Sequence, residues 1–275
     1  MDNTPARPFI IWPGGKRRLL AEIRQRIPLD ISAYWEPFVG GGAVYFSLVD
    51  RIRRAHLSDA NPEITAAYRA VKHSPQALIE ALADLARRHA GDPRVFYEIR
   101  ATDPIDDVGI AARLIYLTKT CFSGRYEVNR QGRFSNSLGK LTRICNPDVI
   151  MSAHRALAGA SIPPAPGGSD FADIRPGAGH FVYGDPPYLG SRRRYTARDF
   201  SYSDHVRLRD AALAWADAGA HVMLSNFDSP EVRALYDSGR FRLHPVSVGR
   251  EISGPGARSW ADSELLITTY EAPNV

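Results

Sequence analysis

The chain has 275 residues, of which 44% are hydrophobic and 24% are charged, values that are ordinary for a globular protein and exclude disorder over most of its length. Its formal net charge of +5, from 35 basic and 30 acidic residues, does not by itself identify a nucleic-acid partner. No apolar run approaches the roughly 18 residues of a membrane span, and residues 1–7 lack the apolar core of a signal peptide, so we expect a cytoplasmic protein.

The first motif is WPGGK, which runs from Trp12 to Lys16. Adjacent glycines permit a sharp path of the backbone, and a lysine is a compact cation that can reach a carboxylate, such as that of a bound amino-acid moiety. A surface turn with a solvated lysine is the alternative interpretation. The motif indicates a binding site only in combination with the motifs later in the chain.

Residues 33–38 form a short apolar run that predicts a buried parallel strand, and residues 43–50 predict the helix after it. The glycine turn between them, residues 40–42, lets a ligand approach the backbone closely. Asp59 ends a second predicted strand, about 20 residues further on, where an acid can accept hydrogen bonds from ribose hydroxyls. Tyr45 replaces the third glycine of the dinucleotide fingerprint, which disfavours a nicotinamide or flavin site. A nucleoside ligand without a pyrophosphate, such as S-adenosylmethionine, remains compatible, as does an ordinary tight turn.

The next segment has a helical pattern. Residues 62–89 carry apolar side chains at spacings of three and four, and residues 114–117 are expected to belong to another helix. Within residues 121–134, two glycine-containing turns flank a stretch of residues with an alternating pattern. This arrangement predicts a hairpin or an extended loop. We therefore expect an inserted, mostly helical domain over residues 62–150.

Basic charge is concentrated in this part of the chain. Residues 113–155 contain eight basic and two acidic residues, a net charge of +6 that exceeds the +5 of the whole chain. Aromatic side chains lie among the basic ones. This combination suits a polyanion with stackable bases, because phosphate neutralisation supplies affinity and aromatic faces engage unstacked bases. A solvated basic loop is the alternative.

A Pro- and Gly-rich stretch over residues 163–179 is expected to be a loop. Two further parallel strands are predicted at residues 180–184 and 221–225, with a helix at residues 229–236 after the second. The order of strand, turn and helix predicts an α/β sheet, in which ligands bind beyond the carboxyl ends of the strands. The cofactor-binding α/β domain would then be discontinuous, comprising residues 1–61 and 151–275.

The most specific motif is Asp185-Pro186-Pro187-Tyr188, which follows an apolar strand. The exocyclic amine of a nucleobase is a poor nucleophile, because its lone pair is delocalised into the ring. Hydrogen bonds from that amine to the Asp185 carboxylate and to the rigidly held Pro186 carbonyl would draw density onto the nitrogen and orient it. Tyr188 could stack on the base, which must first be extruded from the duplex. A purely structural Asp-Pro-Pro turn is the alternative.

Taken in order, these motifs resemble the Dam-type DNA adenine-N6 methyltransferases (D12 class, alpha group), in which the S-adenosylmethionine motif precedes the DPPY motif. The similarity covers most of the chain, including residues 12–16, 36–42, 59–61, 121–139, 185–188, 204–205, 225–226 and 250–266. A lone DPPY has many accidental occurrences, whereas WxGGK, EPFxGxG, SDxN and DPPY in the same order do not arise by chance. The resemblance implies a Rossmann-like methyltransferase sheet with an inserted DNA-recognition domain.

The resemblance also implies roles for individual residues. The residues expected to bind S-adenosylmethionine are Trp12, Lys16, Phe38, Gly40, Gly42, Asp59, Phe171 and Asp185. Asp185, Pro186 and Tyr188 are expected to be catalytic. The residues expected to contact DNA are Lys119, Phe122, Ser123, Arg125, Tyr126, Glu127, Asn129, Arg130 and Arg133. Phe122 occupies the position where the family often has an aromatic wedge.

The hairpin departs from the family pattern. Many relatives have a sequence resembling N-G-L-x-R after the aromatic, and here Glu127 stands where a base-reading arginine is expected. A carboxylate cannot donate to guanine, although it can accept from the amino group of cytosine. The resemblance therefore does not carry the GATC target over to this chain, and Arg125 is the alternative base-reading side chain.

The sequence thus predicts a site-specific enzyme that flips adenine out of double-stranded DNA and methylates its N6 amine by direct SN2 transfer from S-adenosylmethionine. Cytosine N4 is the alternative target, since its amine poses the same electronic problem. A catalytically inactive DNA-binding homologue and a nicotinamide oxidoreductase are the alternatives from other classes. No metal is expected, because the eight histidines and two cysteines show no ligand spacing. A cognate restriction endonuclease is one expected partner.

Overall fold

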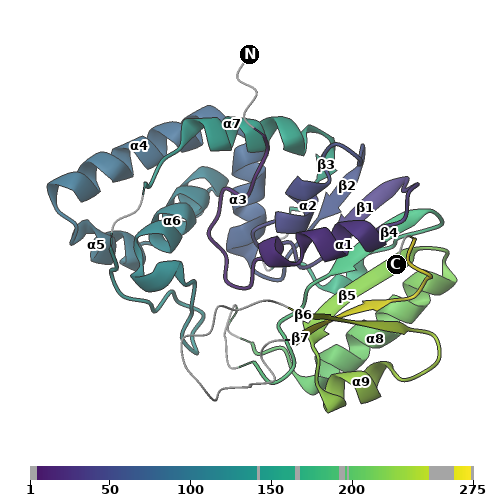
Figure 1. The fold of residues 1–275 in the computed structure, drawn as a ribbon. Coiled ribbons are helices and arrows are strands. Elements are labelled where there is room, and N and C mark those ends of the chain that lie inside the picture. The colour runs from purple at the N-terminus through teal and green to yellow at the C-terminus, as the bar shows by residue number, and fades with distance from the viewer. Residues whose placement is uncertain are drawn as a thin grey trace.

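The computed structural model describes residues 5–140, 143–164, 168–191, 196, 198–247 and 263–273. Its centre is a seven-stranded sheet with the order β3-β2-β1-β4-β5-β7-β6 (Figure 1). The strands are β1 (Ala33–Glu36), β2 (Ala55–Leu57), β3 (Ala160–Ser161), β4 (His180–Gly184), β5 (His221–Phe227), β6 (Arg242–Ser247) and β7 (Ser263–Thr268). The first five are parallel, and β7 runs antiparallel to both β5 and β6. The predicted α/β class is confirmed.

The order of the strands predicts where a ligand-binding crevice lies. From β1 the chain proceeds outward to β2 and β3, and it then returns to β4 on the other side of β1. Such a reversal leaves a crevice beyond the carboxyl ends of the two central strands. Residues 37–42 follow β1 there, and residues 185–188 follow β4. The two predicted motifs therefore lie at the same edge of the sheet.

The helices begin at sequence signals that the chain supplies. They are α1 (Leu20–Arg26), α2 (Ala43–Ser47), α3 (Pro62–His73), α4 (Pro75–Gly91), α5 (Val95–Ala101), α6 (Asp107–Thr120), α7 (Pro147–Ala156), α8 (Tyr202–Asp217) and α9 (Pro230–Tyr236). The Asn61 side chain caps α3, with Pro62 in the first turn, and Ser201 forms a capping box with Asp204 at α8. Each cap satisfies an amide that would otherwise lack an acceptor at the helix N-terminus.

Several predicted boundaries need correction. The stretch 62–89, expected as one helical pattern, is two helices that are interrupted at Ser74, because Pro75 lacks an amide hydrogen and restricts the residue before it. The strand predicted at 33–38 ends at Glu36, and the helix predicted at 43–50 ends at Ser47. Strand β5 continues two residues past the predicted 221–225.

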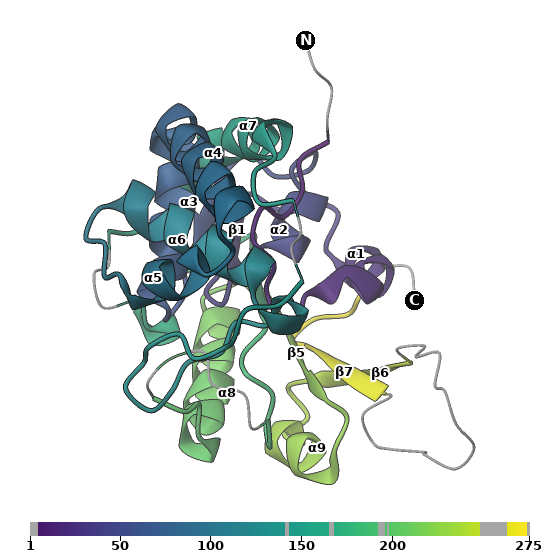
Figure 2. The ribbon, with the colours of Figure 1, turned by 90° about the vertical axis from the view of Figure 1, so that its left-hand side faces the viewer.

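Helices α3 to α7 gather at one side of the sheet, and α8 and α9 cover the other side near β5 (Figures 1 and 2). Buried side chains from α3, α4 and α6 join those of α2, β1 and β2 in one hydrophobic cluster. A second cluster joins α8 and α9 to β4, β5 and β7.

Helix α7 runs across residue 150, where the sequence places a domain boundary. No helix among the described residues is long and apolar enough to cross a membrane.

Candidate active site

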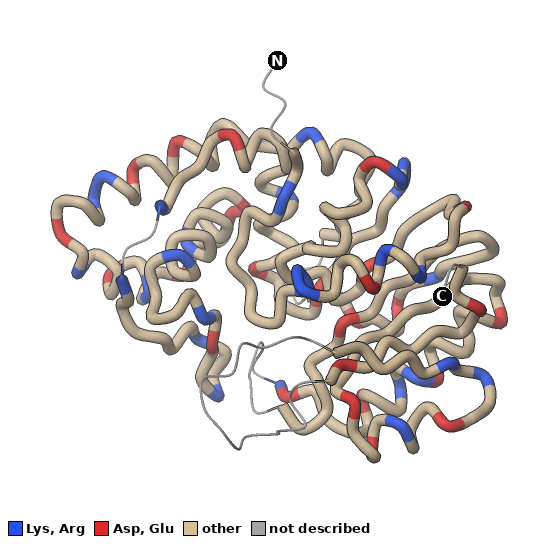
Figure 3. The backbone as a smooth tube through the Cα atoms, viewed as in Figure 1, with Lys and Arg blue, Asp and Glu red and all other residues tan. Residues whose placement is uncertain are grey.

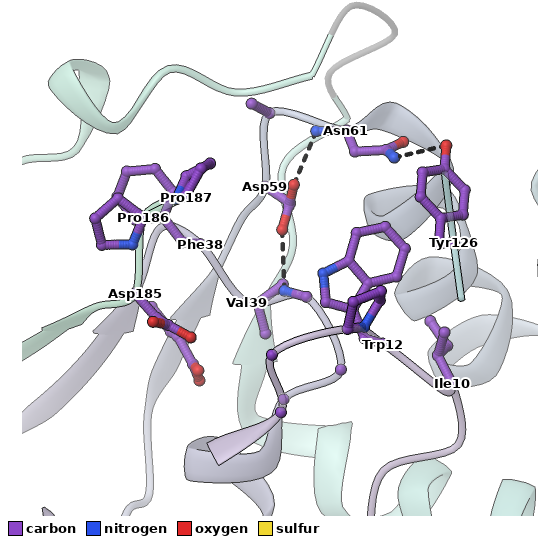
Figure 4. A pocket seen from close by; sticks show the side chains of 18 of the residues that line it. Ile10, Trp12, Phe38, Val39, Asp59, Asn61, Tyr126, Asp185, Pro186 and Pro187 are labelled. Atoms are coloured by element: carbon purple, nitrogen blue, oxygen red, sulfur yellow. Dashed lines mark hydrogen bonds between the residues drawn. The ribbon is translucent and has the colours of Figure 1, made fainter. Parts of the chain in front are cut away.

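A large cavity of about 1690 Å³ opens at the crevice between β1 and β4. The segments that line it include the WPGGK motif, the glycine turn, the residues after β2, residues 168–171, the turn after β4 and the hairpin after α6. Figure 4 shows Trp12 and Asp59 on one side of it and Asp185 with Pro186 on the other. Most of the predicted cofactor and catalytic residues therefore line one space.

The glycine turn is shaped by the tryptophan packed against it. Gly40 and Gly42 have φ values of +45° and +69°, a region that side-chain-bearing residues rarely adopt. A Cβ atom at Gly40 would come within 2.6 Å of Cδ1 of Trp12. The Trp12 ring in turn packs on the ring of Tyr126, with the ring centroids 4.5 Å apart. The turn therefore needs glycine both for its backbone and for the close approach of Trp12.

Asp59 is held at the edge of this turn by backbone amides. Its Oδ2 accepts a hydrogen bond from the Gly40 amide at 2.9 Å, and its Oδ1 accepts one from the Asn61 amide at 2.8 Å. Burial raises the pKa of Asp59 to about 6, against the opposing effect of the two amides. Among the described residues no lysine or arginine pairs with it. The carboxylate retains lone pairs for a ligand that donates from hydroxyl groups.

Aromatic rings form the wall beyond Asp59. Phe38 lies 5.5 Å from Phe171 and 5.8 Å from Phe200, measured between ring centroids. The Arg207 guanidinium covers Phe171 at 5.1 Å and pairs with Asp170 at 2.8 Å. The sequence predicted Phe38 and Phe171 at this site but not Phe200. Such a wall suits a flat heterocycle.

Lys16 lies at the boundary between this wall and the turn after β4. Its Nζ is 2.6 Å from Oδ2 of Asp185, donates to the Gly14 carbonyl at 2.9 Å and lies 4.8 Å from the centre of the Tyr188 ring. The Lys16 residue is only 7% exposed. The lysine predicted to hold a ligand carboxylate is thus paired with the predicted catalytic aspartate.

Asp185 receives a second hydrogen bond that the sequence did not indicate. Ser225, in β5, donates from Oγ to Asp185 Oδ1 at 2.8 Å. The Tyr183 hydroxyl lies 3.1 Å from the same Oγ and serves as its donor. Both carboxylate oxygens therefore have a partner, Ser225 of β5 for Oδ1 and Lys16 for Oδ2, and the two contacts fix the orientation of the side chain.

The rest of the DPPY turn is also tied to the sheet. The Tyr188 hydroxyl donates to Glu264 of β7, and its ring packs edge-on against Phe227 at 4.6 Å. Burial, with the charges of Asp185 and Glu264, raises the pKa of Tyr188 above its usual range. The sequence indicated neither contact. Ser225 and Glu264 both lie within segments that resemble the family. Which side chains they meet depends on the register of the strands, such as the pairing of Phe227 in β5 with Glu264 in β7.

Glu36, at the end of β1, also lines the cavity. It is 3% exposed and accepts a hydrogen bond from the Tyr34 hydroxyl at 2.8 Å. Burial raises its pKa, the Tyr34 bond opposes that shift, and the nearby charges of Asp185 and Asp59 raise it further. Glu36 thus lines the same cavity as Asp59, Asp185 and Lys16, and the burial that raises its pKa favours its uncharged form.

The predicted hairpin is irregular but closed. Isolated antiparallel bridges join Cys121 to Leu138 and Val128 to Phe134, and the Asn136 side chain donates to the carbonyls of Phe122 and Arg125 at 3.0 and 2.8 Å. Ser123 has a positive φ of 58°, strained for a residue with a side chain. The turn that results leaves Phe122 63% exposed.

Burial alternates along the hairpin, which separates the predicted DNA-binding residues into two groups. The exposed ones are Phe122, Ser123, Arg125, Glu127, Asn129, Arg130 and Arg133. Lys119 is half-buried, lines the cavity and donates to the Ile144 carbonyl at 3.0 Å. Tyr126 is 4% exposed and turned toward Trp12, so this conformation does not present it to DNA. Figure 3 shows basic positions along the chain beside α5 and α6.

Among the described residues, no three His, Cys, Asp or Glu side chains gather as a metal site would. Residues 250–262, part of the stretch that resembles the family, lie outside the described residues.

Comparison with known proteins decides the family. Residues 12–252 match the model of the D12 class N6 adenine-specific DNA methyltransferases. The chain belongs to this family. It is 33% identical to the Type II methyltransferase M1.LlaDCHI of Lactococcus lactis subsp. cremoris, over 96% of this chain and 95% of that protein. It is 31% identical to the Type II methyltransferase M.MjaIII of Methanocaldococcus jannaschii, over 96% and 99%, and 29% identical to a DNA adenine methylase of Vibrio cholerae, over 94% and 95%.

This D12-class enzyme is accordingly an adenine-specific DNA methyltransferase, and its sheet is of the Rossmann-like methyltransferase type that the resemblance implied. The expected activity, methylation of the N6 amine of adenine in DNA, is confirmed by the family.

Proposed function

We propose that the cavity binds S-adenosylmethionine between the glycine turn and the Phe38–Phe171 wall. Asp59 carries this proposal, because a half-buried carboxylate that two backbone amides orient suits the paired hydroxyls of a ribose. When bound, the cofactor supplies an electrophilic methyl group on its sulfonium sulfur.

The residues proposed to hold it have distinct tasks. Asp59 would bind the ribose, and Phe38 and Phe171 would face the adenine ring. The backbone of Gly40 and Gly42 would allow close approach, with Trp12 holding the turn in shape. Lys16 would bind the carboxylate of the cofactor's amino-acid moiety. It pairs with Asp185, which would lie between the cofactor and the target base.

The DPPY turn is proposed to activate the target amine. Asp185 and the Pro186 carbonyl would accept hydrogen bonds from the N6 amine of an extruded adenine, drawing density onto its nitrogen. The contacts with Lys16 and Ser225 hold the Asp185 side chain in a fixed orientation for that task. Tyr188, fixed through Glu264, would stack on the base. Direct SN2 transfer to the nitrogen then needs no covalent intermediate on the protein.

Recognition is proposed to reside in residues 62–150, with double-stranded DNA contacted by the exposed face of the hairpin. Phe122, which is 63% exposed, would wedge into the base stack that the flipped adenine leaves. Two of the relatives are named Type II methyltransferases, which favours a cognate restriction endonuclease as a partner of this chain as well.

The test is transfer of labelled methyl from S-adenosylmethionine to duplex DNA, followed by digestion and identification of the modified nucleoside by mass spectrometry. We expect N6-methyladenine from the parent protein and none from Asp185→Ala, which should still bind DNA. N4-methylcytosine in its place would contradict the assigned base. No labelled nucleoside from any duplex or single strand would contradict the proposed site.

A further inference from the structure

Tyr126 is the residue whose position departs most from its predicted role. It belongs to the hairpin, yet its hydroxyl accepts a hydrogen bond from Asn61 Nδ2 at 2.9 Å and donates one to Glu63 Oε2 at 2.8 Å. Its ring lies between Trp12 and Phe134, at 4.5 and 5.6 Å between centroids. The hairpin is thereby attached to the segment that follows β2.

The attachment continues to Asp59. The backbone amide of Asn61 donates to Asp59 Oδ1, and Asp59 Oδ2 accepts from the Gly40 amide at the glycine turn (Figure 4). On the other side, Glu63 accepts from Arg113 of α6 at 2.6 Å. A continuous chain of hydrogen bonds thus runs from the recognition helices through the Tyr126 hydroxyl to the carboxylate proposed to bind ribose.

We infer that Tyr126 is a positioning residue, which makes cofactor binding and the folded conformation of the hairpin depend on each other. This inference rests on the proposed cofactor site at Asp59. With only 4% of its surface exposed, the tyrosine would act through the residues it contacts. It orients Asn61, whose backbone amide orients Asp59, and it supports Trp12 against the glycine turn from the opposite side.

The physical reason is that every partner in this chain of hydrogen bonds is buried or half-buried. Asn61 is 3% exposed and Tyr126 is 4% exposed, so the loss of the hydroxyl leaves a buried amide hydrogen unsatisfied. If the folded hairpin strengthens binding of the ligand at Asp59, binding of that ligand must stabilise the folded hairpin by the same coupling free energy, because coupling between two sites is reciprocal. Cofactor binding should therefore order the segment that reads DNA.

The test compares Tyr126→Phe with Tyr116→Phe, using S-adenosylhomocysteine as the probe. Tyr116 is a matched control, because its hydroxyl also has a buried partner, His89, within the helical region but away from Asn61. Calorimetry gives the affinity for the probe, and hydrogen exchange gives the protection of residues 121–139. We expect the probe to slow exchange of the parent hairpin. Tyr126→Phe should lose that protection and about tenfold in affinity, while Tyr116→Phe keeps both.

A second variant guards against a general loss of stability. Asn61→Ser keeps an oxygen to cap α3 but is too short to reach the Tyr126 hydroxyl. It should lose the same protection, and adding Tyr126→Phe should cause no further loss of affinity for the probe, because the connection from Tyr126 to Asp59 passes through Asn61. Probe binding by the parent without protection of the hairpin, or equal protection in Tyr126→Phe, would overturn the inference and leave the proposed function standing. A parent that binds no probe would refute the proposed cofactor site itself, and the coupling with it.

Discussion

The turn after β4 and the hairpin after α6 both carry proposed functional residues, but they are held in different ways. In the β4 turn, side chains are fixed by side chains from the sheet and from Lys16: Asp185 by Lys16 and Ser225, and Tyr188 by Glu264. In the hairpin, Asn136 holds the backbone through two carbonyls, and side chains such as Phe122 and Glu127 extend into solvent.

This difference has a consequence for how the two regions can change. Replacing a group in the β4 turn leaves a buried partner unsatisfied, which costs more than the bond itself is worth. Replacing an exposed hairpin side chain leaves the backbone scaffold in place. The chemistry proposed for the β4 turn would therefore be fixed by the sheet, while the DNA specificity proposed for the hairpin could change one side chain at a time. Glu127, in the position of an expected arginine, would be one such change.

The largest effect is expected for Asp185→Asn. The amide keeps the shape of the carboxylate but loses the negative charge that polarises the target amine, and it leaves Lys16 without its ion-pair partner. We expect kcat to fall by about 10²–10⁴-fold, the range typical of a group that assists proton movement. Single-turnover methyl transfer measures this, with DNA binding as the control. Activity within about twofold of the parent would remove Asp185 from its role.

What the sequence could predict was set by local chemistry. Strand β4 was predicted to the residue, because an apolar run meets Asp-Pro-Pro, which cannot continue a central strand. The turn at residues 40–42 was also predicted from local sequence, because glycine is the residue that adopts the positive φ values found there. Ser225 and Glu264 could not be found as partners, because their contacts depend on which strands become neighbours in the sheet.

The orientation of Tyr126 could not be predicted from the sequence either, because it also depends on how strands pair. In sequence it lies among basic residues in a hairpin and looks like a base-stacking aromatic. Only the alternation of buried and exposed positions, once Val128 is paired with Phe134, turns Tyr126 inward with Val128 and leaves Glu127 outside. A shift of register by one residue would have exchanged these faces.

The second prediction concerns the support of Asp185 by β5. Ser225→Ala removes the hydrogen bond to Oδ1 and leaves the Tyr183 hydroxyl without its acceptor. A hydrogen bond to a charged group is worth about 1.5–3 kcal/mol, so kcat should fall by about ten- to a hundredfold while the KM for DNA stays unchanged. Steady-state kinetics separate the two constants. Ser225→Thr, which retains the hydroxyl, is the control, and an equal loss there would point to packing instead.

The third prediction is a pH dependence of cofactor binding. Asp59, with a pKa of about 6 before binding, is mostly ionised at pH 7.5 and mostly protonated at pH 5.5. Hydroxyl donors favour the ionised acceptor, so affinity for S-adenosylhomocysteine should weaken as the pH falls, by about fourfold between these values. Calorimetry across this range measures it. Asp59→Asn should bind more weakly at pH 7.5 and show a flatter profile; an unchanged slope would assign the titration to another group.

The smallest effect is expected at the hairpin, where Asn136→Ala removes the amide that holds the carbonyls of Phe122 and Arg125. The bonds are exposed to solvent, so water replaces them at little cost, and we expect the KM for DNA to rise about two- to threefold with kcat unchanged. Gln76→Ala, an exposed amide on α4, is the control. If Asn136→Ala instead lowered kcat as much as Ser225→Ala, the hairpin would be part of the same rigid unit as the β4 turn. In that case the specificity of this enzyme could not vary independently of its chemistry.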